Sequence, residues 1–370
     1  MSDPYIDAPL CRHEGSQEFR LVELKPSELS KSIKCTLRTY AFTSRSPPYT
    51  ALSYTWGQKV KPKEIELNGI PFPVGESLWS FLDQMRRQRQ FRVYWIDAVC
   101  IDQDSMLERN HQVRMMRQIY SNAACVSIWL GGADEHSSSD IAMDFHRDMS
   151  TSHAPEANEK QAEAIFKLYT RDYWSRIWVV QEIFLARDIT VYWGSKSVSW
   201  QRLKYFNQVL VQGFREQRYL ETLTLLRTKA TKLIIERDAY RLGAKYTSLT
   251  ELLVSFDNYE ATNTLDVVYG VCGLAETPLG FTIDYKISPE DLLVKLIHCT
   301  CAAMRHQDVR VLRDFARVMS AALKVEWSQE EMMAHIASAE ECRDWTEDGT
   351  DLTFLPSWLP PPRFGRGGYN

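Results

Sequence analysis

The sequence predicts an α/β protein whose core, at about residues 20–200, is a mainly parallel sheet with helices on both faces. Strand-like and helix-like stretches alternate through this part, and the connections between strands are long enough to be helical crossovers. Two continuous apolar runs within it suit strands that are buried on both faces. Beyond Trp200 strand signals become few, so a helical region is expected to follow.

The first predicted elements are a strand, a hairpin and a helix. Residues 50–56 alternate between apolar and polar side chains, which is the period of a half-buried strand. Residues 64–74 hold Asn68-Gly69 between two β-prone runs, and this dipeptide favours the tight turn of a hairpin. From about Ser77 onward, apolar side chains recur every three or four residues, which predicts a helix.

A strand–helix–strand unit is expected next. The two continuous apolar runs are residues 93–101, with Asp97 at the centre, and residues 125–130. Between them, Ser105 and Glu108 have the spacing of a capping box, in which two side chains satisfy the free N–H groups at the start of a helix.

The rest of the chain is predicted to be mostly helical. Between residues 134 and 158 the composition shifts to Ser, His, Ala and acidic residues, which predicts a surface loop with one short helix. Helices over 159–170 and 173–187 and a strand at 189–193 complete the core. Further helical runs are expected at 201–240, 248–256, 263–274, 289–306 and 308–325. We therefore divide the chain into an α/β core at 1–200, a helical extension packed on it at 201–345 and an extended tail at 346–370.

Composition restricts the classes of partner. Forty-four Lys and Arg residues against 48 Asp and Glu residues leave a net charge of −4, which argues against nucleic acid as a partner. No apolar run is long enough to predict a membrane span, and residues 1–20 lack the apolar segment of a secretory signal. The eight cysteines form no Cys-x-x-Cys pair and are expected to be reduced thiols. A cytoplasmic protein is therefore expected.

Five segments in order resemble the fungal heterokaryon incompatibility (HET) domain family. They include Ser53-Tyr-Thr-Trp-Gly57 and Trp178-Val-Val-Gln-Glu182, and together they occupy residues 49–57, 94–103, 108–116, 126–131 and 176–182. Residues 261–270 are also family-like, although they lack the more charged run that the family usually shows there, and Leu355-Pro-Ser-Trp continues the resemblance towards the C-terminus.

The resemblance implies a role in fungal non-self recognition and induced cell death. HET domains are in turn remotely similar to TIR domains, which implies a flavodoxin-like or TIR-like core. Many TIR domains cleave NAD⁺ with a glutamate on a helix, in a Trp-Cys-x-x-Glu-like setting. Trp178 stands four residues before Glu182, so the resemblance implies that Glu182 is the catalytic residue.

Two interpretations of Glu182 follow from its surroundings in the sequence. The predicted helix over 173–187 is apolar over most of its circumference, and burying an unpaired carboxylate costs several kcal/mol. Glu182 must therefore form an ion pair, for which Arg176 and Arg187 are nearby, or face a cleft. In a cleft it could stabilise the oxocarbenium-like state of nicotinamide–ribose cleavage. Gln181 beside it is expected to be a buried amide with its hydrogen bonds satisfied.

The candidate substrate-binding residues lie at the ends of two predicted strands. Ligands of open α/β sheets bind at the carboxyl ends of strands. Asp97 fits that position, although it could equally cap the following loop. At the end of the first strand the candidates are Ser53, Tyr54, Trp56 and Gly57, and Trp178 joins them beside Glu182. The alternative is a buried strand followed by a solvated loop that carries Lys59, Lys61 and Lys63.

Other chemistries have weaker support. Asp97, Asp102 and Asp104 match no metal-binding spacing, and the last two suit helix capping. Cys100 and His111 are the best thiol–imidazole combination, but nothing in the sequence brings them together. No metal site is predicted, and no Gly-rich phosphate loop of a standard type occurs.

The leading hypothesis is therefore an NAD⁺ glycohydrolase that triggers cell death when it self-associates. NAD⁺ is then the substrate and no cofactor is needed. A homo-oligomer and a protein partner in non-self recognition are expected, and the 134–158 loop could cover the pocket. The alternative is a non-enzymatic, TIR-like signalling and assembly module that acts through downstream partners.

Overall fold

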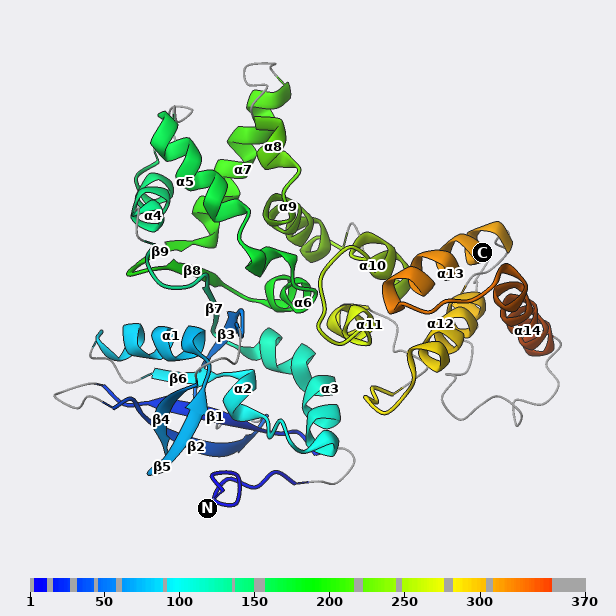
Figure 1. Ribbon diagram of the computed structural model, residues 1–370, viewed down its shortest axis with the longest axis horizontal. Helices are drawn as coiled ribbons and strands as arrows, with labels where there is room; N and C mark the ends of the chain where they lie inside the picture. The colour runs from blue at the N-terminus through cyan, green and yellow to red at the C-terminus, as the bar shows by residue number, and fades with distance from the viewer. Residues whose placement is uncertain are drawn as a thin grey trace, which may run out of the picture. The chain divides into compact units, whose positions relative to one another are not determined.

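The protein was studied as a computed structural model, which divides into two compact units, Met1–Lys245 and Tyr246–Asn370 (Figure 1). The structure describes residues 3–11, 16–26, 32–42, 46–57, 62–88, 92–134, 137–149, 157–215, 222–243, 248–275, 282–303 and 309–347.

The first unit is built on a nine-stranded sheet with the order β5-β4-β2-β1-β6-β3-β7-β8-β9. The strands are β1 (Glu18–Leu24), β2 (Lys34–Ala41), β3 (Thr50–Tyr54), β4 (Lys63–Leu67), β5 (Ile70–Val74), β6 (Arg92–Trp95), β7 (Cys125–Trp129), β8 (Ile189–Trp193) and β9 (Lys196–Ser199). The predicted strands at residues 50–56, 125–130 and 189–193 and the hairpin at 64–74 are confirmed.

The sheet is mixed, with parallel pairing in its centre and between β2 and β4. The pairings β6·β3, β3·β7 and β7·β8 are parallel, whereas β1 pairs antiparallel with both β2 and β6, and β8 pairs antiparallel with β9. The expectation of a mainly parallel sheet therefore needs correction to a mixed sheet. The sequence reading missed β1 and β2, which precede the strand–helix alternation, and β9, which returns by a tight turn after β8.

The order in which the four central parallel strands are added to the sheet reverses at β3. In chain order they are β3, β6, β7 and β8, but across the sheet they lie as β6-β3-β7-β8. The chain leaves β3 for a neighbour on one side and then returns to pair on the other side. Such a reversal leaves space beyond the carboxyl ends of the strands, where open α/β sheets bind ligands.

The hairpin between β4 and β5 has the geometry that its sequence predicts. Asn68 and Gly69 both have positive φ, 51° and 81°. A two-residue turn with positive φ at both positions matches the right-handed twist of the strands, and Asn-Gly tolerates it.

The apolar run at residues 93–101 is half strand and half helix. β6 ends at Trp95, and a short helix, α2 (Asp97–Cys100), follows. The amide of Cys100 donates to the carbonyl of Ile96 at 2.7 Å, which closes a helical turn. The prediction of one strand over this run was wrong because a continuous apolar run looks the same in a buried helix and a buried strand.

Helices cover both faces of the central strands. They include α1 (Glu76–Arg86) and α3 (Met106–Asn122). The ring of Phe81 in α1 contacts Tyr94 of β6, whereas Tyr120 in α3 contacts Trp95, the next residue of that strand. Because successive side chains of a strand point to opposite faces, α1 and α3 lie on opposite sides of the sheet. All four of these side chains are buried and belong to the core.

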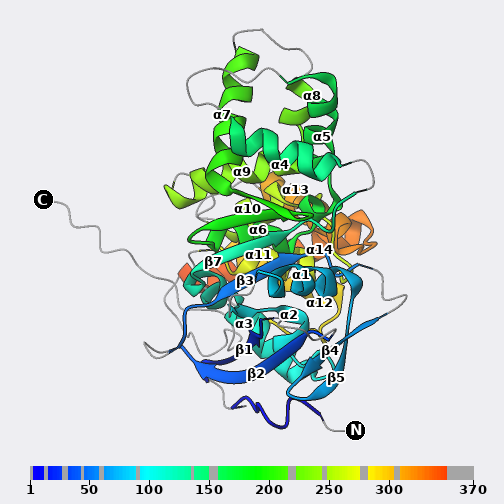
Figure 2. The same cartoon turned by 90° about the vertical axis from the view of Figure 1, so that its left-hand side faces the viewer.

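A group of helices lies beyond β8 and β9, at the end of the unit away from β4 and β5 (Figures 1 and 2). It contains α4 (Ser138–Asp148), α5 (Glu159–Tyr169), α7 (Trp200–Arg215), α8 (Thr222–Leu226) and α9 (Lys229–Arg241). The short helix expected within residues 134–158 is α4, and the helix expected at 159–170 is α5. Because α7 and α9 pack within the first unit, that unit runs to Lys245, whereas the sequence placed the end of the core at residue 200.

The predicted helix over 173–187 is interrupted. It consists of a 3₁₀ turn, η1 (Asp172–Ser175), and α6 (Trp178–Leu185). Arg176 between them has φ −69° and ψ 136°, which is an extended conformation. The interruption turns the guanidinium group of Arg176 towards the end of β3, where it donates to the carbonyl of Tyr54.

The second unit is helical over its described residues. Its helices are α10 (Leu249–Ser255), α11 (Asp266–Cys272), α12 (Pro289–Ala303), α13 (Val309–Leu323) and α14 (Gln329–Glu347). The first four correspond to predicted helical runs, whereas α14 was not predicted. The tail expected from residue 346 lies almost entirely outside the described residues. No helix that the structure describes is both long and apolar enough to cross a membrane.

Candidate functional site

A buried polar cluster lies at the carboxyl end of β3, where the order of the central strands reverses. Ser53 of β3 points to the face of the sheet that α6 covers, and its hydroxyl donates a hydrogen bond to Oε2 of Glu182. Glu182 is 3% exposed and Ser53 is 1% exposed. Residues 129 positions apart in the sequence are therefore joined at the place where this class of sheet binds ligands.

Hydroxyl groups surround the Glu182 carboxylate. The Tyr173 hydroxyl lies 2.5 Å from Oγ of Ser53, and because Ser53 donates to Glu182, Tyr173 donates to Ser53. The Tyr120 hydroxyl donates to the carbonyl oxygen of Leu52 at 3.3 Å, and it also favours the ionised form of Glu182. Tyr120 and Tyr173 are both buried. The sequence reading missed both tyrosines, because in sequence Tyr120 looks like an ordinary core residue of an amphipathic helix.

Burial raises the pKa of Glu182 to about 7. The Arg176 guanidinium and the Ser53 and Tyr120 hydroxyls favour the ionised form and partly oppose this shift, whereas the negative charge of Asp97 adds to it. The loss of hydration on burial is the largest of these effects on the pKa, as expected for a carboxyl group that has hydroxyl partners and no ion pair. Glu182 can therefore change its protonation state near neutral pH, which is the property of a general acid or base.

The predicted ion pair of Glu182 does not form. Among the described residues, no Lys or Arg nitrogen lies within 4.0 Å of its carboxylate. Arg176 acts on Glu182 from a greater distance while it donates to the Tyr54 carbonyl. Arg187 is directed elsewhere and donates to the carbonyl of Ser121 at 2.7 Å. The open cleft of the other interpretation is not present at Glu182 either, because that side chain is almost completely buried.

Asp97 forms the outer part of the cluster. Its Oδ2 accepts a hydrogen bond of 2.8 Å from the indole N–H of Trp56, and its Oδ1 accepts one from the amide of Ala98. Asp97 and Trp56 are both partly exposed. Burial raises the pKa of Asp97, and the charge of Arg176 with the Trp56 hydrogen bond opposes this shift. Asp97 thus lies in the first turn of α2, where its carboxylate accepts from the backbone, and its charge also acts on Glu182.

The remaining predicted site residues lie at different distances from the cluster. The Tyr54 side chain points to the sheet face opposite Ser53, because the two are neighbours in one strand, and only its carbonyl binds Arg176. Trp178 starts α6, is partly exposed, and lies one helical turn before Glu182 on the same helix face. Gly57 is exposed and has a φ of 73°, a left-handed conformation that favours glycine.

The lysine loop after Gly57 gives no support for a phosphate site. Lys63 pairs with Glu76 at 3.4 Å, and its ammonium group lies over the ring of Trp79. The Lys63 side chain is therefore held against α1. Lys59 and Lys61 lie outside the described residues.

Two other predictions about polar residues can be compared with the structure. Gln181 is buried, but its Oε1 has no hydrogen-bond partner, so the expectation of a fully satisfied amide was wrong. Cys100 does not meet His111. The amide of Ile96 donates to the Cys100 sulfur, burial raises the pKa of its thiol to about 12, and the His111 ring binds the Ser16 carbonyl. A thiol with this pKa is a poor nucleophile.

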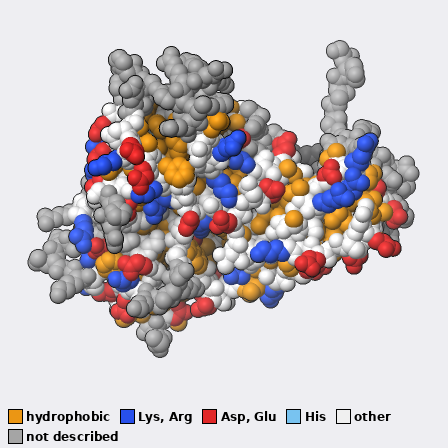
Figure 3. Space-filling model, turned by 45° about the horizontal axis from the view of Figure 1, so that its top comes forward, with side chains coloured by type: hydrophobic (Ala, Val, Ile, Leu, Met, Phe, Trp, Pro, Cys, Tyr) orange, Lys and Arg blue, Asp and Glu red, His pale blue; other side chains and the backbone are white. Residues whose placement is uncertain are grey.

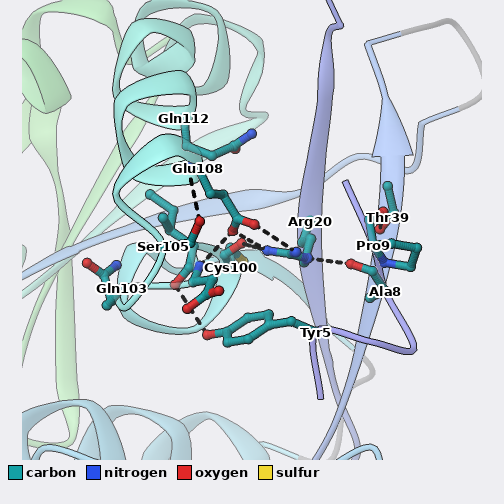
Figure 4. A network of polar contacts seen from close by, with 12 residues as sticks. Tyr5, Ala8, Pro9, Arg20, Thr39, Cys100, Gln103, Ser105, Glu108 and Gln112 are labelled. Atoms are coloured by element: carbon teal, nitrogen blue, oxygen red, sulfur yellow. Dashed lines mark hydrogen bonds and ion pairs between the residues drawn. The ribbon is translucent and has the colours of Figure 1, made fainter. Parts of the chain in front are cut away.

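A second carboxylate, that of the half-buried Glu108, has a different environment (Figure 4). Arg20 of β1 binds it with two nitrogens, at 2.5 and 3.1 Å, and also donates to the carbonyls of Ala8 and Cys100. The Glu108 side chain also accepts from the amide of Asp102. Only half of the predicted capping box therefore forms: Ser105 accepts from the amide of Glu108, but the Glu108 side chain turns to Arg20.

A surface hollow of about 210 Å³ lies in the second unit instead of at Glu182. It lies between α13 and the start of α14, and Figure 3 shows Lys and Arg side chains beside hydrophobic ones in this part of the surface. Its lining residues are Arg313, Arg317, Trp327, Gln329, Met332 and Met333. This lining offers neither a carboxylate nor a nucleophile, so we assign the candidate reaction site to the Glu182 cluster.

Comparisons with known proteins match the segment of the chain that contains this cluster. The family model described as "Heterokaryon incompatibility protein (HET)" matches residues 49–182. The chain is also 26% identical, over 414 aligned residues, to Heterokaryon incompatibility protein 6, OR allele, of Neurospora crassa. The alignment covers 94% of this chain and 58% of that protein, so the chain spans about three fifths of its relative's length. No solved structure matches the chain. The match to the heterokaryon incompatibility (HET) family model thus covers residues 49–182, which contain both Ser53 and Glu182.

Proposed function

We propose that this protein acts in heterokaryon incompatibility and triggers cell death by hydrolysing the nicotinamide–ribose bond of NAD⁺. In this proposal it works in the cytoplasm, self-association activates it, and a protein partner in non-self recognition supplies the trigger. The HET family match and the name of the Neurospora relative support the biological role.

One observation carries the enzymatic part of the proposal. A carboxyl group whose pKa is raised to about 7 lies at the reversal point of the central strands, joined to Ser53 and near Asp97. The β6-β3-β7-β8 order agrees with the first four strands of the flavodoxin-like order, which supports a remote relation to TIR domains. Perturbed carboxylates at such positions are candidates for catalysis.

The chemistry needs few groups. When the C–N bond breaks, its electron pair leaves with nicotinamide, and the ribose carbon acquires positive charge. Ionised Glu182 would stabilise this oxocarbenium-like state. Water then adds to the ribose carbon, and its extra proton is released through Glu182, so that NAD⁺ and water become ADP-ribose, nicotinamide and a proton.

The burial of Glu182 supports a second candidate function. With 3% exposure, the carboxylate has no free access for a substrate in this conformation. If it remains closed, the cluster is a structural element of a non-enzymatic assembly module. If self-association opens it, the same burial keeps the isolated chain inactive.

The decisive experiment measures NAD⁺ consumption by purified protein over a range of concentrations, with oligomeric state followed by light scattering. Glu182→Gln keeps the shape and removes the charge. Asp172→Asn is the matched control, because Asp172 is an exposed carboxylate in the neighbouring η1 turn.

We expect wild type and Asp172→Asn to consume NAD⁺ and Glu182→Gln to be slower by at least about a hundredfold. Equal NAD⁺ consumption by all three proteins would show that the protein is an enzyme but that Glu182 is not its catalytic residue. No consumption by folded, oligomeric wild type would support the assembly module.

A further inference from the structure

The Glu182 cluster contains more negative than positive charge. Two carboxylates, Glu182 and Asp97, act on each other, and one guanidinium, that of Arg176, acts on both. The other titratable groups that face Glu182 are the hydroxyls of Tyr120 and Tyr173, from α3 and η1, and both are uncharged near neutral pH because burial raises their pKa values further. Tyr54 acts from β3 in the same uncharged form.

One cation can balance only one of the two carboxylates. Arg176 is also held by the Tyr54 carbonyl, and no described carboxylate lies within 4.0 Å of it. When both carboxylates are ionised, the cluster has one unbalanced negative charge in a buried setting. Burying such a charge is costly, so the cluster either keeps a proton or takes up a cation.

The partly exposed side of the cluster suits a flat cation. Trp56 is fixed there by its hydrogen bond to Asp97, and Trp178 lies on the Glu182 face of α6. Both indoles are partly exposed. Aromatic faces attract cations, most strongly where water is excluded, and an adjacent carboxylate adds direct charge attraction.

We propose that this site recognises its ligand by the positive charge of a pyridinium ring, with Asp97 as the specificity-determining residue, and that binding expels a proton from Glu182. The inference rests on the proposed function for the location of the ligand site. The cationic ring and the proton of Glu182 compete for the same unbalanced negative charge. A neutral ring of the same shape would then bind weakly and without proton release.

The direction of the pH dependence follows from this competition. Below the pKa of Glu182, a proton must leave before the cation is fully stabilised. The affinity for the cation therefore falls by up to about tenfold for each pH unit below that pKa, and it is constant above it. The affinity for a neutral ring does not follow this profile.

The test uses two probes of nearly equal shape, 1-methylnicotinamide, whose methylated ring nitrogen makes it a permanent cation, and nicotinamide, which is neutral. Titration calorimetry on the full-length protein from about pH 5.5 to about pH 8.5, in buffers of different ionisation enthalpy, gives both the affinity and the number of protons released. We expect the cation to bind at least about tenfold more tightly at the upper pH, with proton release near pH 6.

Three variants separate charge from shape. In Glu182→Gln the pH dependence and the proton release should disappear, and in Asp97→Asn the preference for the cation should fall at every pH. Asp172→Asn should behave as wild type, because its carboxylate is exposed on η1. Near-ultraviolet circular dichroism shows whether each variant is folded.

Equal binding of the two probes, absence of binding by both, or pH dependence that persists in Glu182→Gln would overturn the inference. If the protein binds the cation with release of a proton but does not consume NAD⁺, the inference is supported and the proposed function is contradicted. NAD⁺ consumption without a preference for the cationic probe would do the reverse.

Discussion

Two glutamates of the first unit, the half-buried Glu108 and the buried Glu182, have opposite kinds of partner. Glu108 shares two contacts with Arg20, and both side chains also bind backbone groups. Glu182 is bound by hydroxyl groups and has its nearest cation, Arg176, beyond ion-pair distance. A fully paired buried charge holds elements together, whereas a buried carboxyl group without an ion pair can take up and release a proton near neutral pH.

The largest expected effect on stability comes from breaking the paired site. Glu108→Gln leaves the Arg20 guanidinium buried, at 1% exposure, without its carboxylate. We expect a loss of about 3–5 kcal/mol in the free energy of unfolding, measured by urea denaturation. Replacing both residues, as in Arg20→Met with Glu108→Leu, should recover much of this loss. A loss below about 1 kcal/mol in Glu108→Gln would mean that the pair does not hold β1 to α3.

The second prediction concerns the pH dependence of stability due to Glu182. Its pKa rises from 4.5 to about 7 on folding, so the folded state holds the proton more tightly than the unfolded state does. The stabilisation is complete below pH 4.5 and is lost as pH rises through about 7, which corresponds to about 3 kcal/mol at most. Wild type should lose stability relative to Glu182→Gln over this range, as urea unfolding at several pH values would reveal. Parallel curves for the two proteins would contradict the raised pKa.

The third prediction compares the two arginines that the sequence offered as partners. Arg176→Gln removes the cation that favours ionised Glu182, so the pKa of Glu182 should rise above 7 by about one unit. Arg187→Gln should leave it unchanged, because Arg187 binds the Ser121 carbonyl instead. Carbon-detected NMR of the labelled carboxyl group measures both values. The same shift in both variants would show a nonspecific charge effect.

The smallest effect is expected from a single hydroxyl. Ser53→Ala removes a hydrogen bond that favours the ionised carboxylate, so the pKa of Glu182 should rise, by less than in Arg176→Gln. The same NMR titration measures it. Ser53→Thr, which retains a hydroxyl, is the matched control. An unchanged pKa in Ser53→Ala would show that Tyr120 alone supplies the stabilising hydrogen bond.

Local sequence patterns predicted many of the helices and strands but not the full set of strands that make up the sheet. Asn68-Gly69 predicted its hairpin because the turn depends on adjacent residues. The run around Asp97 misled the strand prediction, since full burial removes the alternation that distinguishes strand from helix. The antiparallel strands β1 and β2 were missed because they lie outside the strand–helix alternation on which the reading relied.

Part of the candidate site was likewise predictable from the sequence, and part of it was not. The resemblance singled out Glu182, and the end of the first strand was predictable from where α/β sheets bind ligands. Tyr120 and Tyr173 were missed, since hydroxyl groups of buried tyrosines carry no spacing signal. An ion pair of Glu182 with Arg176, one of the alternatives that the sequence left open, does not form: Arg176 lies in the break between η1 and α6 and donates to the Tyr54 carbonyl.

By itself, the sequence determined the α/β class, most local elements and the presence of one carboxylate in an apolar helix. These properties depend on side-chain periodicity and on contacts between close neighbours in the chain. Only the tertiary structure decided that this carboxylate lies among the hydroxyls of Ser53, Tyr120 and Tyr173 while the half-buried Glu108 binds Arg20. The reason is that electrostatic environment depends on which groups share a dry volume, and the strand order across the sheet sets that.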